Sequence, residues 1–211
     1  MWPDPSPTQQ LLAQIADGDG NAVNGLMERH RVALRRLVEL RLDRGLAQRL
    51  DASDVVQDVL IEAHSRLENY LKNPQIPFHL WLRQMAKDRM IDLHRQHHAL
   101  RRDVSRERAL DAPAVSDASM VALAANLAAS ELTPAAAALQ KEFQERFRMA
   151  LAELPEDDQE ILTLRHAEQL GNSEVAQILK LSPAAAGMRY LRALRRLREL
   201  LGSDEPRPPE S

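Results

Sequence analysis

The sequence predicts an all-α protein made of two small helical domains joined by a flexible linker, the second a helix-turn-helix domain. Aromatic residues make up only 3% of the 211 residues. This scarcity, with abundant alanine, leucine and arginine, disfavours β-sandwiches and barrels. Apolar residues recur at helical spacing before and after residues 109–140, but not within them. Near the C-terminus, a short apolar helix precedes a serine-proline pair and an arginine-rich helix, which is the helix-turn-helix pattern.

The first domain is expected over residues 1–108, with its first two helices before residue 43. Thr8 is expected to cap a short helix over residues 9–16, which the Asp-Gly-Asp-Gly turn at 17–20 ends. A longer helix follows from Asn21, and its buried side is Leu26, His30, Leu34, Leu37 and Leu42.

Two further helices complete this domain. Asp51 is expected to open the third, whose buried stripe is Val55, Val59, Ala63 and Leu67, with Val56 and Leu60 alongside. The fourth is expected from about Phe78 to His98, with an apolar set of Trp81, Leu82, Met85, Met90 and Leu93.

Residues 109–140 are predicted to be a linker. They contain three acids, no lysine or arginine and two prolines, and they lack large apolar side chains at steady spacing. Such a segment buries too little surface to fold alone. The second domain is expected over residues 141–202, and residues 203–211 are expected to form a frayed tail. Its first helix should pack Phe143, Phe147, Leu151 and Leu154 on one face and end at Pro155.

The helix-turn-helix is predicted within residues 172–200. Ser182 is expected to cap the second helix, with Pro183 at its first position. The apolar face of this helix is predicted to be Met188, Leu191, Leu194 and Leu197, with Arg189, Arg192 and Arg196 on the other face. Two short helices joined in this way present the second to the major groove of DNA. The alternative is an amphipathic helix with a solvated arginine face.

Charge is unevenly distributed along the chain, although its formal net charge is only −3. Residues 51–69 hold five acids and one arginine, and Asp54, Asp58 and Glu62 follow one another at four-residue spacing along one flank. Residues 83–108 hold eight basic residues and four acids, and residues 187–198 hold five arginines and no acid. One acidic and two basic segments indicate two different kinds of partner.

Several classes of protein are disfavoured. The chain has no cysteine, which excludes disulfides and thiolate chemistry. Neither a signal peptide nor a membrane span is apparent, so we expect a cytoplasmic protein without a membrane partner. A metal cluster of Asp92, His94, His97 and His98 is disfavoured because it would lie in a basic segment. With no catalytic triad or phosphate loop, we expect no enzyme and no cofactor.

Three segments, taken together, resemble the bacterial RNA polymerase sigma factors of the extracytoplasmic-function (ECF) group. These are LDASDVVQDVLIEAHSRLENY at 50–70, FHLWLRQMAKDRMIDLHRQHH at 78–98, and ALAELPEDDQEILTLRHAEQLGNSEVAQILKLS with MRYLRALRRLREL at 150–200. The resemblance covers about residues 8–201. It implies a protein that works on core RNA polymerase and promoter DNA, in some family members held inactive by an anti-sigma protein.

The resemblance also implies where each partner binds. The helix at 51–70 is expected to dock on the polymerase clamp through Asp51, Asp54, Val55, Gln57, Asp58 and Glu62. The next helix is expected to recognise and open the promoter −10 element through Phe78, Trp81, Lys87, Asp88, Arg89, Asp92, His94 and Arg95. The −35 element is expected to meet Ser182, Ala184, Ala185, Met188, Arg189, Arg192 and Arg196. The alternatives are a solvated acidic face and a core role for Trp81.

This sequence departs from the family pattern at three places. Asp88 stands where asparagine is usual, and Gly187 where a basic residue is frequent. Lys180 occupies a turn position where glycine is common, so the turn either avoids positive φ or carries strain. A rival function is an autonomous helix-turn-helix regulator with an N-terminal sensing or dimerisation domain. That hypothesis leaves the basic segment at 83–108 and the acidic row before it unexplained.

Overall fold

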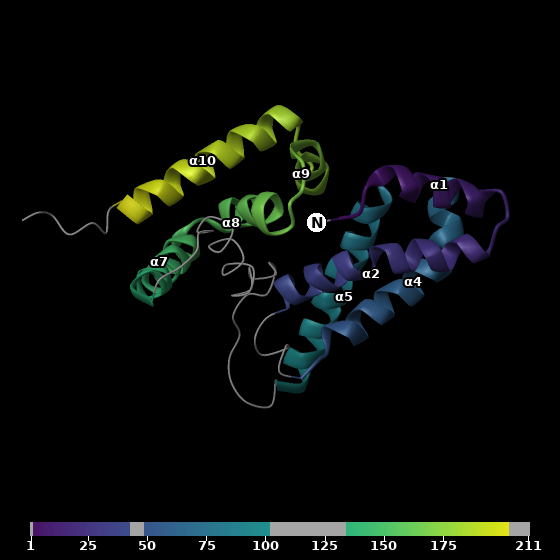
Figure 1. Cartoon of the computed structure of the whole chain (residues 1–211), viewed down its shortest axis with the longest axis horizontal. Helices are drawn as coiled ribbons and strands as arrows, with labels where there is room; N and C mark the ends of the chain where they lie inside the picture. The colour runs from purple at the N-terminus through teal and green to yellow at the C-terminus, as the bar shows by residue number, and fades with distance from the viewer. Residues whose placement is uncertain (1, 43–48, 102–133, 203–211) are drawn as a thin grey trace, which may run out of the picture. The chain divides into compact units, whose positions relative to one another are not determined.

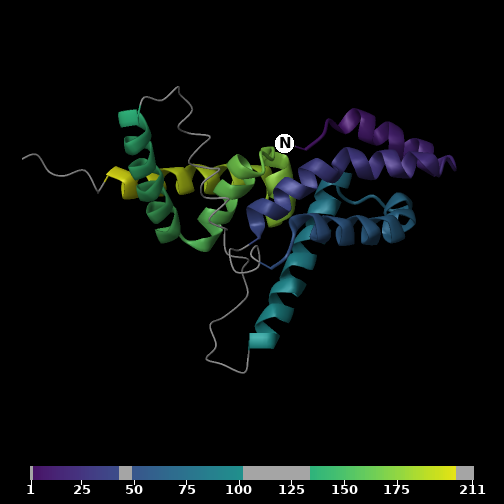
Figure 2. The ribbon, with the colours of Figure 1, turned by 60° about the horizontal axis from the view of Figure 1, so that its bottom comes forward.

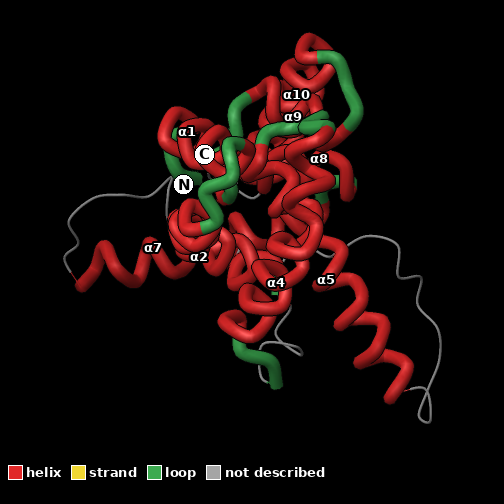
Figure 3. Tube along the Cα trace, turned by 90° about the vertical axis from the view of Figure 1, so that its right-hand side faces the viewer, coloured by secondary structure: helices red, strands yellow, loops and turns green. Residues whose placement is uncertain are grey.

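The structure is a computed structural model that describes residues 2–42, 49–101 and 134–202. These residues form helices joined by turns and short loops, with no strand among them, as Figures 1 and 3 show. The helices fall into two compact units, which divide between residues 114 and 115. The tail at 203–211 and residues 102–133, which include most of the expected linker, lie outside the described residues. The all-α prediction with a helix-turn-helix domain is confirmed.

Unit 1 contains helices α1 (Pro5–Ala16), α2 (Asn21–Arg41), α4 (Ala52–Lys72) and α5 (Phe78–Arg101). Helix α2 lies against each of the other three, and α4 also packs on α5. The core is built from the predicted stripes of α2 and α4, all of which are buried, with Leu82, Met85 and Met90 of α5. In Figure 2 the second half of α5 runs past the ends of α2 and α4.

The start of α1 differs from the sequence prediction. Asp4, not Thr8, caps the helix, because its carboxylate accepts a hydrogen bond from the Ser6 backbone N–H at 2.7 Å. Thr8 lies one turn into the helix and is buried, with its hydroxyl 3.1 Å from Nε2 of His30 on α2. The expected Thr8 cap is therefore wrong, because that hydroxyl joins α1 to α2 instead.

Aromatic rings join α4 to α5 across the turn at residues 73–77. The Tyr70 ring lies 5.5 Å from Phe78 and 4.8 Å from Trp81, measured between ring centroids. The Tyr70 hydroxyl donates a hydrogen bond to the Ile76 carbonyl at 2.9 Å, which ties the turn to the helix before it. Stacked and edge-on rings at these distances add stability beyond the area that they bury.

Unit 2 contains α7 (Pro134–Glu153), α8 (Glu156–Leu162), a short π-helical turn η1 (Thr163–Ala167), α9 (Asn172–Leu179) and α10 (Pro183–Gly202). Helix α10 packs on α7, α8 and α9. The core includes Phe147, Leu151, Leu154, Ile161, Leu162, Leu164, Val175, Ala176, Ala186, Ala193 and Leu197. The predicted burial of Phe147, Leu151 and Leu154 is confirmed, whereas Phe143 is exposed.

The turn between α9 and α10 follows the predicted chemistry at its end. Ser182 caps α10, since its hydroxyl accepts a hydrogen bond from the Ala185 backbone N–H at 3.1 Å, and Pro183 is the first helical residue. The Asn172 amide donates to the Pro183 carbonyl at 2.9 Å, which joins the starts of α9 and α10. Lys180 ends α9 with φ of 54°, in the left-handed region. The sequence allowed either a turn that avoids positive φ or one that carries strain. The positive φ of Lys180 confirms the second expectation.

We expect acid to weaken unit 1 through His30. Burial, with smaller contributions from His79 and Arg29, lowers the pKa of His30 from 6.5 to about 4. The unfolded chain therefore takes up this proton first as pH falls, and stability is lost between about pH 6.5 and pH 4. Between pH 7 and pH 5 this loss should be about 2 kcal/mol.

The measurement is urea unfolding at the two pH values, followed by fluorescence, because Trp2 and Trp81 both lie in unit 1. The His30→Gln variant is the control and should lack this part of the pH dependence. Equal pH dependence in the two proteins would contradict the assignment.

We expect Lys180→Gly to stabilise unit 2 by up to about 1 kcal/mol, because glycine adopts a positive φ without the steric cost of Cβ. Lys180→Ala is the matched control: it removes the charged chain but keeps Cβ, and it should give no such gain. Differential scanning calorimetry measures both. A glycine variant no more stable than the alanine variant would argue against strain at this turn.

Candidate functional site

An acidic row lies along one flank of α4. Asp54 and Asp58 are exposed, and Glu62 is half-buried. Asp58 accepts a 2.6 Å contact from Nη2 of Arg89 on α5, and Glu62 pairs with Arg66 at 2.7 Å. The row therefore presents carboxylates to solvent, while Asp58 also ties α4 to α5.

The other α4 residues expected to dock on a partner are placed differently. Asp51 caps the helix, and hydrogen bonding from Ser53 lowers the pKa of its carboxyl. Gln57 is exposed, whereas Val55 is only 2% exposed and lies in the core. Its side chain is therefore not available to a partner in this structure.

Sequence analysis missed one apolar residue on the outer face of α4. Ile61 is 61% exposed and follows Asp54, Gln57 and Asp58 at helical spacing. The signal was available, because Ile61 falls off the buried stripe that continues through Val59 and Ala63. The outer face of α4 thus combines carboxylates with one exposed aliphatic side chain.

The residues expected on α5 divide between core and surface. Phe78 is 3% exposed and belongs to the core, and Trp81 is half-buried against it. Lys87, Arg89 and His94 are half-buried, and Asp88, Asp92 and Arg95 are exposed. Partial burial, reinforced by Asp92 and Glu62, raises the pKa of Asp88. The side chains of His97 and His98, two members of the disfavoured metal cluster, lie outside the described residues.

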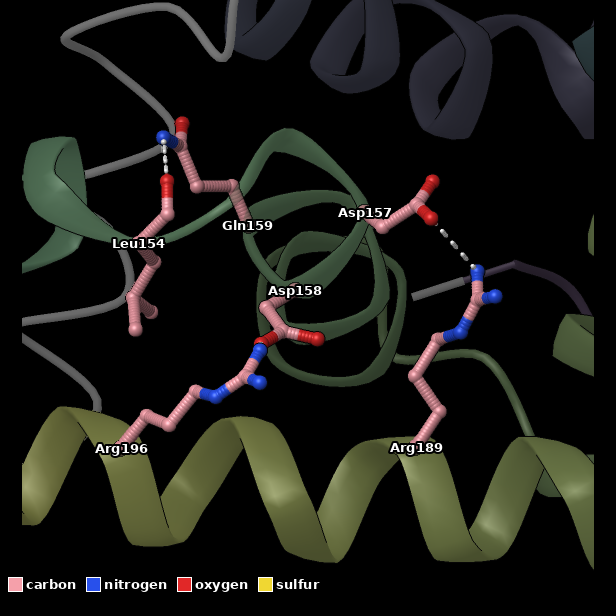
Figure 4. Close-up of polar contacts among 6 residues, drawn as sticks. All are labelled: Leu154, Asp157, Asp158, Gln159, Arg189 and Arg196. Atoms are coloured by element: carbon pink, nitrogen blue, oxygen red, sulfur yellow. Dashed lines mark hydrogen bonds and ion pairs between the residues drawn. The ribbon is translucent and has the colours of Figure 1, made fainter.

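Two arginines of α10 are held by α8, as Figure 4 shows. Nη1 of Arg196 lies 2.5 Å from Oδ2 of Asp158, whose residue is 4% exposed. Nη1 of Arg189 lies 3.4 Å from Oδ2 of Asp157, which is exposed. The adjoining Gln159 amide donates to the Leu154 carbonyl at 2.8 Å and ties α8 to the end of α7.

These ion pairs also lay outside the sequence prediction. The acids at 156–158 form the first turn of α8, where negative charge is favoured by the positive end of the helix dipole. Their second use, as partners for arginines some 30 residues later, depends on how α10 crosses α8. Local sequence carries no signal for such a crossing.

The predicted apolar face of α10 is wrong in its first half. Met188 is 63% exposed and Leu191 is 54% exposed, whereas Ala186, Ala193 and Leu197 are buried. The physical reason is close packing: small alanines face α8 and α9, and the helix is rotated accordingly. Its outward side carries Ala184, Ala185, Met188, Leu191, Arg192 and Arg195, all exposed.

A second set of contacts fixes the middle of α10. The His166 ring nitrogen Nε2 lies 2.9 Å from the Tyr190 hydroxyl, and the Arg165 guanidinium lies 5.3 Å from the Tyr190 ring centroid. Both partners come from η1, whose π-helical turn is of a kind that often marks functional positions. Burial and Arg165 lower the pKa of His166. Together with Asp158, η1 sets the rotation of α10.

Two protein-family models match this chain. The model for Sigma-70 region 2 matches residues 26–99, across α2, α4 and α5, and the model for Sigma-70, region 4 matches residues 144–197, from α7 into α10. The chain is a sigma factor. It is similar to RNA polymerase sigma factor CnrH of Cupriavidus metallidurans, with 29% identity over 194 residues that cover 92% of this chain and 94% of that protein.

The fold supports the same family assignment. The structure of CnrH in complex with the cytosolic domain of CnrY is similar to this one, with a TM-score of 0.53 and 25% identity over 96% of this chain and 100% of that one. The sigma factor belongs to the ECF group that its sequence resembles. It binds core RNA polymerase and directs it to promoters, and it is not an enzyme. None of its described helices has the length and apolarity to cross a bilayer.

The predicted function is therefore confirmed, and the rival regulator is not favoured. A helix-turn-helix alone would fit either protein. The region 2 match covers the first unit, where the rival would need a sensing or dimerisation domain. That match also spans the acidic segment at 51–69 and residues 83–99 of the basic segment, which the rival left unexplained.

We expect Arg196 and Arg195 of the sigma factor to differ in their contribution to stability. Arg196→Ala leaves the buried Asp158 carboxylate without its partner and should lower the free energy of unfolding by about 2 kcal/mol. Arg195→Ala, next to it but exposed, should change it by less than about 0.5 kcal/mol. Calorimetry measures the stability of the two variants. Equal losses would show that the Asp158 pair does not anchor α10.

Proposed function

We propose that the sigma factor divides its work among four helices. On this proposal, α4 in a domain of residues 1–108 docks on core polymerase, and α5 recognises and opens the −10 element. After a linker at 109–140, whose last residues overlap the start of α7 at Pro134, α9 and α10 in a domain of residues 141–202 recognise the −35 element. The observation that carries the proposal is the segregation of charge: carboxylates face outward on α4, and exposed arginines follow one another along α10.

The polymerase-binding surface is proposed to be the outer face of α4. Asp54 and Asp58 supply charge for a basic partner, Gln57 supplies hydrogen bonds, and Ile61 adds an apolar contact between them. A surface of one charge sign steers association and sets specificity more than it sets affinity. Asp51 and Glu62 flank this face, and both are engaged within unit 1. The buried Val55 supports the surface from beneath.

The proposed role of α5 is to hold opened promoter DNA. Single strands are bound by basic side chains that track the backbone and by aromatic faces on which bases stack. Lys87 and Arg95 are accessible for the first task, and the half-buried Trp81 for the second. Phe78 contributes through its ring, 5.6 Å from that of Trp81, which holds Trp81 in place. Asp88, Asp92, Arg89 and His94 lie on the same helix and are proposed to contact bases or phosphates.

The proposed role of α10 is to enter the major groove at the −35 element. In helix-turn-helix proteins the first residues of the second helix meet base edges. Here those are Ser182, Ala184 and Ala185, followed by Met188 on the same exposed side, and Arg192 comes one turn later, where it can contact DNA beside them. Arg189 and Arg196 lie at the edge nearest α8, where ion pairs with Asp157 and Asp158 orient them.

Regulation by a partner protein extends this proposal. The similar protein CnrH was solved in complex with the cytosolic domain of CnrY. We propose that an anti-sigma protein likewise holds this sigma factor inactive. We further propose that the sigma factor acts in the cytoplasm, because its polymerase and promoter partners are there.

The test of polymerase docking is charge reversal on the outer face of α4. Asp54→Lys combined with Gln57→Lys should lower affinity for purified core polymerase at least tenfold, because two cations would face a basic partner. Both residues are exposed, so circular dichroism should be unchanged. Asp58 is left intact because it also holds Arg89.

Asp17→Lys is the matched control, since Asp17 is an exposed acid in the turn after α1. It should leave polymerase binding and promoter-dependent RNA synthesis unchanged. Wild-type affinity of the double variant for core polymerase would refute the docking surface.

A further inference from the structure

We infer that α10 reads its promoter element through thymine 5-methyl groups, contacted by Met188 and Leu191, and not through arginine–guanine hydrogen bonds. This inference rests on the proposed entry of α10 into the major groove and specifies the chemistry that it recognises there. It begins from two side chains that a folded domain normally buries. Met188 is 63% exposed and Leu191 is 54% exposed, on a helix whose other side is packed.

The rotation of α10 decides which side chains a groove can meet. Ala186, Ala193 and Leu197 are buried against the rest of unit 2, and Tyr190 is held by His166. Residues on the opposite side are therefore the ones presented outward. From Ala184 to Leu191 these are Ala184, Ala185, Met188 and Leu191, none of which carries a side-chain hydrogen-bonding group other than the weak thioether acceptor, and the exposed Arg192 follows directly.

The arginines nearest this surface have other positions. Arg189 and Arg196 lie on the flank that faces α8, each beside a carboxylate. Arg192 and Arg195 are exposed and come after the apolar pair, toward the C-terminal half of the helix. Base edges are met mainly by the N-terminal part of a recognition helix, so Arg192 and Arg195 are placed to grip phosphates at the groove wall.

An apolar side chain finds one apolar feature in the major groove, the thymine 5-methyl group. Methionine and leucine leave unpaired the hydrogen-bonding groups that guanine, cytosine and adenine present on that edge, and cytosine carries no methyl group at C5. The small Ala184 and Ala185 let the helix approach closely beside them. The chemistry of this surface therefore favours thymine at the positions that Met188 and Leu191 reach.

The experiment uses holoenzyme reconstituted from the full chain and core polymerase. A randomised upstream segment in double-stranded promoter DNA is selected for binding, and each thymine of the selected −35 element is then replaced singly by deoxyuridine. Deoxyuridine keeps every hydrogen-bonding group and lacks only the methyl. Affinity should fall about fourfold at each contacted thymine, the loss expected for one buried methyl group.

Two variants assign the contact to its side chain. Met188→Ala should abolish the difference between thymine and deoxyuridine at one position while leaving it at the position that Leu191 reaches. Met149→Ala is the matched control, because Met149 is a methionine of α7 with similar exposure. This variant should keep the wild-type difference in affinity between thymine and deoxyuridine at both positions.

The outcomes separate this inference from the proposed function. Selection of no −35 element would mean that α10 does not read promoter DNA, and both proposals would fail. A selected element that tolerates deoxyuridine at every position would overturn the methyl contact alone. If Met188→Ala instead weakens assembly with core polymerase, the exposed pair is a protein-binding surface and the inference is wrong.

Discussion

The rotation of α10 about its own axis is the constraint on which the second unit depends. Buried alanines bring this helix close to α8 and α9, and the buried Asp158 holds Arg196 at a fixed position along it. Tyr190 adds a hydrogen-bonding contact and a cation contact with η1. Rotating a helix about its axis changes which residues it presents outward. These few contacts therefore decide which side chains DNA encounters.

Unit 1 relies on α4 for two tasks at once. Its valine and leucine stripe is buried against α2 and α5, and its outer flank carries the carboxylates. The buried stripe makes the outer face rigid, because the packed side holds the backbone that displays it. A docking surface built on such a helix loses little conformational entropy when a partner binds.

Much of this arrangement was predictable from sequence where the pattern was regular. The stripes of α2 and α4 recur at constant spacing in large aliphatic residues, and both are buried as predicted. The start of α10 was predictable because serine is favoured as a helix N-cap and proline at the first helical position. The acidic row and its exposure followed from the same spacing, although the buried Val55 shows that a position in a docking helix need not reach a partner.

The failures share a physical origin. On α10 two faces carry apolar residues, and sequence analysis chose the larger side chains, Met188 and Leu191, over Ala186 and Ala193. Close helix crossing favours the small residues, and a single sequence does not reveal which neighbour a helix crosses. The pairs of Asp157 and Asp158 with arginines of α10 were hidden for the same reason, as was the hydroxyl of Thr8 beside His30.

The contact between Asp58 and Arg89 has a consequence for how two binding events in initiation depend on each other. A basic residue of another protein that approaches Asp58 competes with the Arg89 guanidinium for one carboxylate. Capture of Asp58 from outside would release a cation on α5, the helix proposed to hold the opened strand. Exchange of this kind couples two binding events through a shared anion, and the coupling acts equally in both directions.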